Sequence, residues 1–248
     1  MNVPDIEALV QEVANLGNSA YEFNLEAILS LQPDLIVTWG HVAPNGDPNT
    51  VYEQLSRIAP TIVFSDNPFS HWKKATLDLA RALGIPERGE EVLSSYRQNA
   101  DEACERIKTT SEGGTFTFLS LYERDITLAG PGFMTEQETY IPDGITSWAY
   151  IDCQLQPSPE TVQLSQTDRA SVSLEILAEF EADHLILFAG TEPLTQETLQ
   201  TLLDHPLWQR IPAVQQGQVH QLSTVSTGLY EALHTIKQAA DIITGETD

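Results

Sequence analysis

The sequence predicts an α/β protein built as two lobes with mainly parallel sheets, joined by one long helix. Two observations lead to this prediction. Apolar runs of strand length alternate with longer helical patterns along the 248 residues, which is typical of parallel sheets covered by helices. One helix–turn–strand pattern also occurs twice, once in each half of the chain. A chain of this length can bury one large core or two smaller ones.

The expected elements follow from apolar periodicity and from the Gly and Pro residues that interrupt it. We expect strands at 35–39, 61–64, 116–121, 184–188 and 219–222. Helices are expected at 24–31, 50–58 and 69–83, and one long helix at 87–108. Gly84-Ile85-Pro86 separates the last two helices, and Gly113-Gly114 follows the long one. We therefore expect an N-terminal lobe over 1–86, a connecting helix over 87–110 and a C-terminal lobe over 111–248.

The repeated pattern covers residues 24–40 and 173–189. Each copy begins with Asn or Ser, which favour the N-cap position of a helix. Each then has a glutamate in the expected first turn, Glu26 or Glu175, where the helix dipole favours an anion. Each copy ends in an apolar strand preceded by an aspartate. A match of this length can arise by chance in any α/β protein, but it suggests two similar lobes.

The charge of the chain restricts its partners. Twelve Lys and Arg residues against 36 Asp and Glu residues give a formal net charge of −24. Such a surface repels nucleic acid and anionic lipid headgroups, so we exclude both as main partners. It favours solubility and would also attract a basic patch on a protein partner. No apolar run approaches the roughly 20 residues of a membrane span, and no export signal is visible.

The two cysteines, Cys104 and Cys153, fit neither a metal-binding spacing nor a CxxC redox motif. They could pair in an oxidising compartment. We expect two separate thiols instead.

Candidate ligand-binding residues follow the expected strands, because open parallel sheets bind ligands beyond the carboxyl ends of their strands. Large flat side chains gather there, and they suit a bulky, partly apolar ligand. Several could equally be core residues. The candidates are Trp39, His41, Phe69, Trp72, Tyr122 and Arg124.

Motifs of the common enzyme classes are missing from the sequence. It has no Gly-x-Ser-x-Gly elbow, no phosphate-binding P-loop and no His-Glu-x-x-His. His41 and His71 follow neighbouring strands and could share a metal, but no third ligand is patterned with them. We therefore expect no enzymatic activity, no intrinsic cofactor and no metal site of the protein's own.

Four segments carry a resemblance to a known family. They are Asn24 to Val37, Ser173 to Leu177 with Ala182-Asp183, Pro206 to His220, and Leu83 to Pro86 before the long helix. Together they resemble the periplasmic binding proteins that deliver ferric siderophores, haem and cobalamin to ABC importers. The resemblance runs from about residue 14 to residue 243. It implies two α/β lobes joined by a helix, with a metal chelate held in the cleft between them.

The resemblance also implies roles for individual residues. Glu26 and Glu175 match the glutamates with which the family docks onto arginines of its permease. Trp39 matches a strand-end position that contacts ligand, and Tyr122 and Arg124 lie near a position that is often basic. The family normally begins with a strand, a helix and a second strand that this sequence does not contain. We therefore expect an N-terminal lobe that is either incomplete or built differently from the family's.

The function implied is that of a monomeric binding protein of an ABC importer, located in the periplasm or anchored by lipid outside the inner membrane. It would capture a ferric siderophore or a similar metal chelate and deliver it to a permease. Haem or cobalamin binding remains open. So do a chelatase-like metal enzyme of related architecture and an interaction protein without a transport role. The sequence gives no account of residues 133–169.

Overall fold

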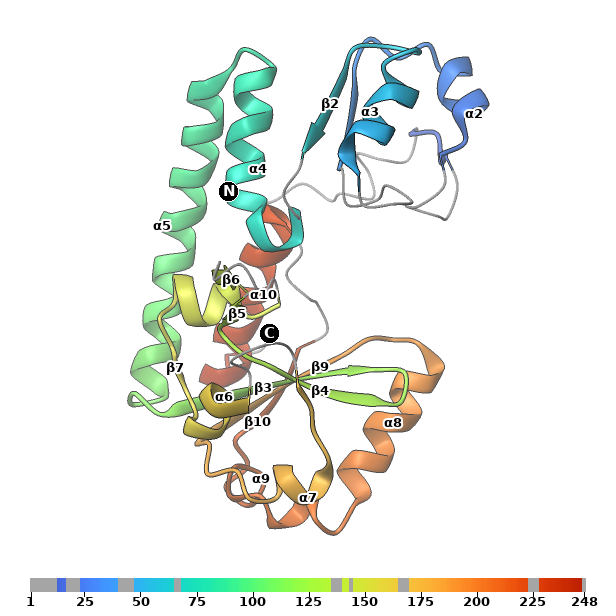
Figure 1. Ribbon diagram of the computed structural model, residues 1–248. Coiled ribbons are helices and arrows are strands. Elements are labelled where there is room, and N and C mark those ends of the chain that lie inside the picture. The colour runs from blue at the N-terminus through green and yellow to red at the C-terminus, as the bar shows by residue number, and fades with distance from the viewer. Residues whose placement is uncertain are drawn as a thin grey trace. The chain divides into compact units, whose positions relative to one another are not determined.

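The computed structural model describes residues 13–16, 23–39, 47–64, 68–134, 140–142, 145–164, 170–222 and 228–246, of which 68–70, 133–134, 140–142 and 170 are described for the backbone alone. The chain divides into two compact units, Met1–Gly89 and Glu90–Asp248. The division falls inside helix α5 (Pro86–Thr110), so most of this helix belongs to the second unit (Figure 1).

The first unit has a pair of parallel strands, β1 (Ile36–Trp39) and β2 (Thr61–Phe64), with Trp39 opposite Phe64. Its helices are α2 (Leu25–Ser30), α3 (Pro48–Leu55) and α4 (Pro68–Ala82). The Asn24 side chain caps α2 by accepting the backbone N–H of Ala27 at 3.0 Å. A small core forms around Ile28, Val51 and Leu55.

The second unit contains a six-stranded sheet in the order β10-β9-β3-β4-β8, with β7 also beside β3. The pairs β10–β9, β9–β3 and β3–β7 are parallel, whereas β3–β4 and β4–β8 are antiparallel. A separate antiparallel pair joins β5 and β6. The strands are β3 (Thr115–Tyr122), β4 (Asp125–Ala129), β5 (Gly132–Met134), β6 (Tyr140–Pro142), β7 (Gln156–Pro157), β8 (Ala170–Ser171), β9 (His184–Ala189) and β10 (Val219–Leu222).

Helical segments lie between the strands of this sheet in the sequence. The hydrophobic core of the second unit includes Leu119, Leu187, Ile211 and Trp208. β9 has a strand on each side and is buried at every position. The helical segments are π-helix η2 (Trp148–Asp152), α6 (Pro159–Leu164), α7 (Leu174–Leu177), α8 (Pro193–Asp204), 3-10 helix η3 (Trp208–Arg210), α9 (Pro212–Gln215) and α10 (Leu229–Thr244).

The predicted fold class is confirmed, since both units are α/β and the five predicted strands form parallel pairs. The antiparallel strands were not predicted. β4 follows β3 after only the two-residue turn Glu123-Arg124, and the other strands of this group are two or three residues long. Runs of two or three residues carry too little alternation to be recognised in a sequence.

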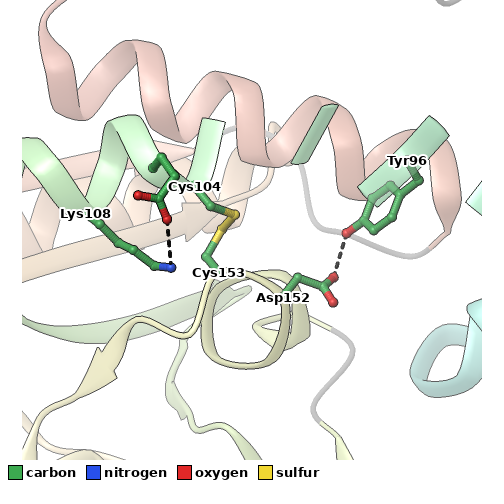
Figure 2. Close-up of a disulfide and its surroundings, with 6 residues drawn as sticks. Tyr96, Cys104, Lys108, Asp152 and Cys153 are labelled. Carbon is green, nitrogen blue, oxygen red and sulfur yellow. Dashed lines mark hydrogen bonds and ion pairs between the residues drawn. A yellow bond between two sulfur atoms is a disulfide. The ribbon is translucent and has the colours of Figure 1, made fainter. Parts of the chain in front are cut away.

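The expectation of two separate thiols is wrong. Cys104 on α5 and Cys153 next to η2 form a disulfide across 49 residues, with their Cα atoms 5.0 Å apart (Figure 2). Both residues are buried. Tertiary packing of η2 against α5 brings them together, which their spacing in the sequence could not reveal. Nearby, the Tyr96 hydroxyl donates a hydrogen bond to Asp152 at 2.6 Å.

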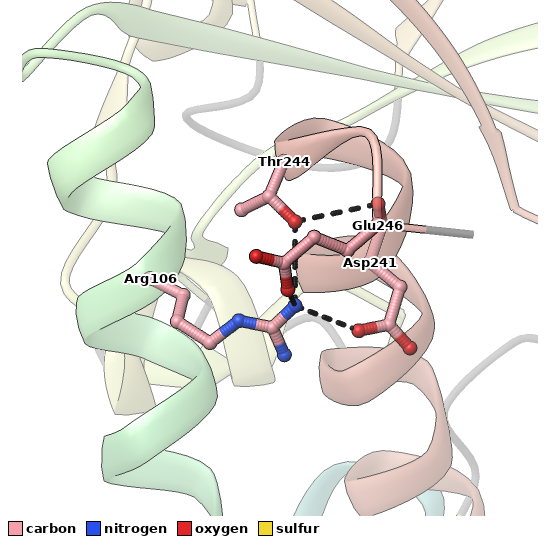
Figure 3. A network of polar contacts seen from close by, with 4 residues as sticks. All are labelled: Arg106, Asp241, Thr244 and Glu246. Atoms are coloured by element: carbon pink, nitrogen blue, oxygen red, sulfur yellow. Dashed lines mark hydrogen bonds and ion pairs between the residues drawn. The ribbon is translucent and has the colours of Figure 1, made fainter. Parts of the chain in front are cut away.

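A polar network joins α5 to the end of the chain. The guanidinium of Arg106 on α5 contacts Asp241 at 2.9 Å, Glu246 at 2.5 Å and the Thr244 hydroxyl at 3.3 Å (Figure 3). The hydrogen bond to Asp241 and the two carboxylates raise the pKa of Arg106. The disulfide and this network together hold the C-terminal half of α5 within the second unit.

In the part of the chain that the structure describes, no helix combines the length and the apolar character needed to cross a membrane.

Candidate functional site

The carboxyl ends of β3 and β9 lie at one edge of the second unit's sheet, since the two strands are parallel and Leu121 is opposite Ala189. Tyr122 is the last residue of β3, and its side chain is 66% exposed. Glu123 and exposed Arg124 form the turn into β4. The structure therefore places the predicted pair Tyr122 and Arg124 on one turn at the edge where such sheets bind ligands.

Side chains in the first half of α8 form hydrogen bonds with backbone groups at this edge of the sheet. The backbone N–H of Glu123 donates to the Thr195 hydroxyl at 3.0 Å, and the Thr198 hydroxyl donates to the Glu123 carbonyl at 2.5 Å. The Gln196 amide donates to the carbonyl of Gly190, just beyond β9, at 2.5 Å. Sequence reasoning missed these three residues, because Thr and Gln on a helix carry no signal for a distant backbone partner.

Arg124 also lines a cavity of about 310 Å³, whose other walls come from β4, α7 and α8. Its lining is mostly apolar, with Ile126, Leu174, Leu194 and Leu202 beside the polar groups of Arg124, Glu197, Thr198 and Thr201. Leu174 precedes Glu175 in α7. The structure thus brings Arg124 close to the helix that carries one of the predicted docking glutamates.

Two of the predicted ligand-binding residues of the first unit have described side chains. Trp39 ends β1 and is 38% exposed, whereas Trp72 in α4 is buried, with the Lys73 ammonium 5.3 Å from its ring centre. Phe69 lies at the start of α4, but its side chain is outside the described part. His41 lies outside the described residues altogether.

Glu26 and Glu175 occupy the same position in their helices. Each is exposed in the first turn, and each helix is capped by the predicted residue, Asn24 or Ser173. Hydrogen bonds from its own backbone N–H and from the Ser173 hydroxyl lower the pKa of Glu175. Glu175 is therefore ionised at neutral pH and presents a fixed negative charge to solvent.

His184 and His220 form a buried pair on neighbouring strands, with Nδ1 of His184 3.4 Å from Nε2 of His220. His184 also stacks on Phe116, with the ring centres 4.7 Å apart. Burial lowers the pKa of both imidazoles, that of His220 to about 4, so both are neutral at pH 7. Within the described residues, no three His, Cys, Asp or Glu side chains are grouped so that they could hold a metal ion.

Comparison with known proteins finds relatives of this chain. It is 26% identical over 241 residues to the HTH-type transcriptional activator Btr of Bacillus subtilis, covering 96% of this chain and 41% of the regulator. It is 24% identical over 219 residues to the iron-uptake system-binding protein of the same organism, covering 88% of this chain and 63% of that protein. The chain thus spans less than two thirds of the length of either relative.

The crystal structure of Staphylococcus aureus SirA has the same fold. It matches with a TM-score of 0.73 at 20% identity, over 96% of this chain and 85% of SirA. SirA has also been solved in complex with staphyloferrin B.

A family model described as periplasmic binding protein matches residues 10–224, which is most of the chain and covers the larger part of each unit. The chain belongs to the periplasmic binding protein family.

Proposed function

We propose that this chain captures a ferric siderophore or a similar metal chelate and delivers it to the permease of an ABC importer. The observation that carries the proposal is the match to the periplasmic binding protein family over residues 10–224. The chelate is suggested by the iron-uptake system-binding protein and by SirA with its bound staphyloferrin B. In this role the chain is a binding protein and not an enzyme, and its iron arrives already chelated.

Tyr122 and Arg124 are the ligand contacts that we propose in the second unit. The exposed phenol ring offers a flat apolar face, and the guanidinium offers donors for the oxygen-rich, anionic groups of a chelate. Trp39, at the end of β1, is the proposed contact in the first unit.

The disulfide supports a location outside the cytoplasm. Disulfides persist in oxidising compartments and are rare where glutathione keeps thiols reduced. Buried Cys104 and Cys153 are paired, so we propose that the chain works in the periplasm or anchored at the outer face of a membrane.

A second candidate function is the ligand-sensing part of a transcriptional regulator. It is favoured by the similarity to Btr, which covers nearly all of this chain. A regulator that binds DNA works in a reducing compartment, where the disulfide would not persist. The thiol state of the protein in its native host separates the two roles, because trapping of free Cys104 and Cys153 with a thiol reagent would favour the regulator.

Titration of tryptophan fluorescence tests ligand capture. Ferric catecholate, ferric hydroxamate, ferric citrate, haem and cobalamin are added separately to the full chain, which has four tryptophans. We expect a ferric chelate to quench the emission with micromolar or tighter affinity, about −8 kcal/mol or better. Response to haem or cobalamin alone would reassign the ligand, and response to none would reject the proposal.

The Trp39→Ala substitution locates the contact in the first unit. Loss of an aromatic contact should weaken binding by about 1–3 kcal/mol. Tyr52→Ala is a matched control, because Tyr52 is also an exposed aromatic residue of the first unit but lies on α3. Equal effects of both substitutions would argue against Trp39 as a ligand contact.

A further inference from the structure

Helix α8 is bonded to the ends of two neighbouring strands through three polar side chains of its first half. Thr195 accepts the N–H of Glu123, Thr198 donates to the carbonyl of Glu123, and Gln196 donates to the carbonyl of Gly190. The first two bonds hold the N–H and the carbonyl of Glu123 in the turn after β3, and the third holds the carbonyl of the residue that follows β9. Figure 1 shows α8 beside the tip of the β3–β4 hairpin.

The turn needs this support because of its backbone conformation. Glu123 has a φ of 51°, in the left-handed region that is unfavourable for residues with a Cβ. Its neighbours Tyr122 and Arg124 are both exposed, so packing of their side chains holds the turn only weakly. Thr195, in contrast, is fully buried and presents its hydroxyl from a fixed position.

We propose that Thr195, Gln196 and Thr198 are positioning residues that hold the ligand-binding edge of the second unit in its binding geometry before the chelate arrives. This inference rests on the proposed function, and it adds residues that do not touch the ligand themselves. A loop that is ordered in advance loses less conformational entropy on binding, so the same contacts give a higher affinity.

The spacing of the three side chains along α8 suits this role. Thr195 and Thr198 are three residues apart and so lie on one face of α8, the face toward the turn. Gln196, one residue after Thr195, reaches the neighbouring strand end. One helix thereby sets the relative position of the turn after β3 and the segment after β9, which are adjacent in the sheet.

The test uses Thr→Val substitutions, which keep the shape of the side chain and remove its hydroxyl. Thr195→Val removes the acceptor of the Glu123 N–H, and Thr198→Val removes the donor to the Glu123 carbonyl. Thr201→Val is the matched control, because Thr201 is on the same helix and lines the same cavity as Thr198. The Thr201 hydroxyl donates to the carbonyl of Glu197 four residues earlier, as the Thr198 hydroxyl also does to the carbonyl of Leu194, so the two residues differ in the bond to Glu123. Thr195→Ser and Thr198→Ser retain the hydroxyl and should restore the wild-type behaviour.

Two properties are measured: the dissociation constants for ferric catecholate, ferric hydroxamate and ferric citrate, and the hydrogen-exchange rate of the Glu123 amide. We expect each Val variant to bind roughly five- to tenfold more weakly, as for the loss of one hydrogen bond. The Glu123 amide should exchange faster in Thr195→Val, while Thr201→Val and both Ser variants match the unaltered chain. Thr198→Val, at a half-buried position, provides the test if Thr195→Val does not fold.

Two outcomes would overturn the inference while leaving the proposed function intact. In the first, both Val variants bind a chelate as tightly as the unaltered chain does. In the second, Thr201→Val weakens binding as much as they do. If the unaltered chain binds none of the three chelates, the proposed function fails and this inference fails with it.

Discussion

Residues 24–39 and 173–189 share one sequence pattern and form the same elements, a capped helix followed by a parallel strand, yet the two strands are buried differently. In β1, Val37 and Trp39 are each 38% exposed, whereas in β9 the corresponding Ile186 and Phe188 are almost fully buried. Among the described residues, β1 pairs with β2 alone, while β9 has β3 and β10 on its two sides. Local sequence determines which elements form, and the surrounding sheet determines how much apolar surface they bury.

The largest effect is expected at the matched strand positions. Ile186→Ala removes fully buried methyl groups and should destabilise the second unit by about 2–5 kcal/mol. Val37→Ala, at the corresponding exposed position, should cost well under about 1 kcal/mol. Hydrogen exchange read separately on β9 and β1 measures both, and β1 should also be the less protected strand in the unaltered chain. Similar losses at the two positions would show that β1 is buried like β9.

Loss of the disulfide should destabilise the second unit but not the first, and the effect should be almost as large. Replacing Cys104 and Cys153 by Ser should destabilise the second unit by about 2–4 kcal/mol, because the unfolded chain has more conformations without the cross-link. Protection of β1 and β2 should stay unchanged, since both cysteines belong to the second unit. Loss of protection throughout the chain would instead show that the units unfold together.

Acid should weaken the second unit selectively. The pKa of His220 is about 4 in the folded chain against 6.5 as its ordinary value. The unfolded chain therefore binds protons first, and stability is lost as the pH falls from about 6.5 to about 4. The loss should be roughly 2 kcal/mol at pH 5. His184, the partner of His220, is surrounded by the Asp183 carboxylate, the Gln218 side chain and the Ser111 backbone. The pKa of Asp183 is lowered, so this carboxylate takes up a proton only below this pH range.

Unfolding of the second unit in urea at pH 7 and pH 5 measures this loss. His220→Phe is the comparison, because it keeps a buried ring and removes the titrating group. An equal loss of stability in His220→Phe and the unaltered chain would assign the acid sensitivity to other groups.

The sequence predicted the parallel strands, the repeat, both N-caps and the exposure of Glu26 and Glu175. These features depend on local patterns, such as an apolar run or a capping residue before a helix. It did not predict the disulfide, the His184–His220 pair or the bonds from α8 to Glu123. Each of these joins residues at least 36 positions apart, and only tertiary packing brings them together.

The exposure of the candidate ligand residues was harder to predict than that of the candidate docking residues, Glu26 and Glu175. A position after a strand shows that a side chain is near the binding edge, but not whether it faces solvent. Tyr122 is mostly exposed there, whereas Trp72, chosen by the same reasoning, is buried. Glu26 and Glu175 were simpler to place, because the first turn of a short capped helix fixes their position.

The measurement that tests the importer assignment most directly is uptake of radioactive iron, supplied as the chelate that the chain binds, by cells of the native host that carry Glu26→Arg and Glu175→Arg together. Gln at both positions is the milder comparison. Glu181→Arg is the matched control, because Glu181 is another exposed glutamate of the second unit. Charged pairs steer association and fix the orientation of partners. Our account predicts that the double Arg variant folds, binds its chelate with unchanged affinity and supports no uptake, while Glu181→Arg transports normally. Normal uptake by the folded double Arg variant would contradict it.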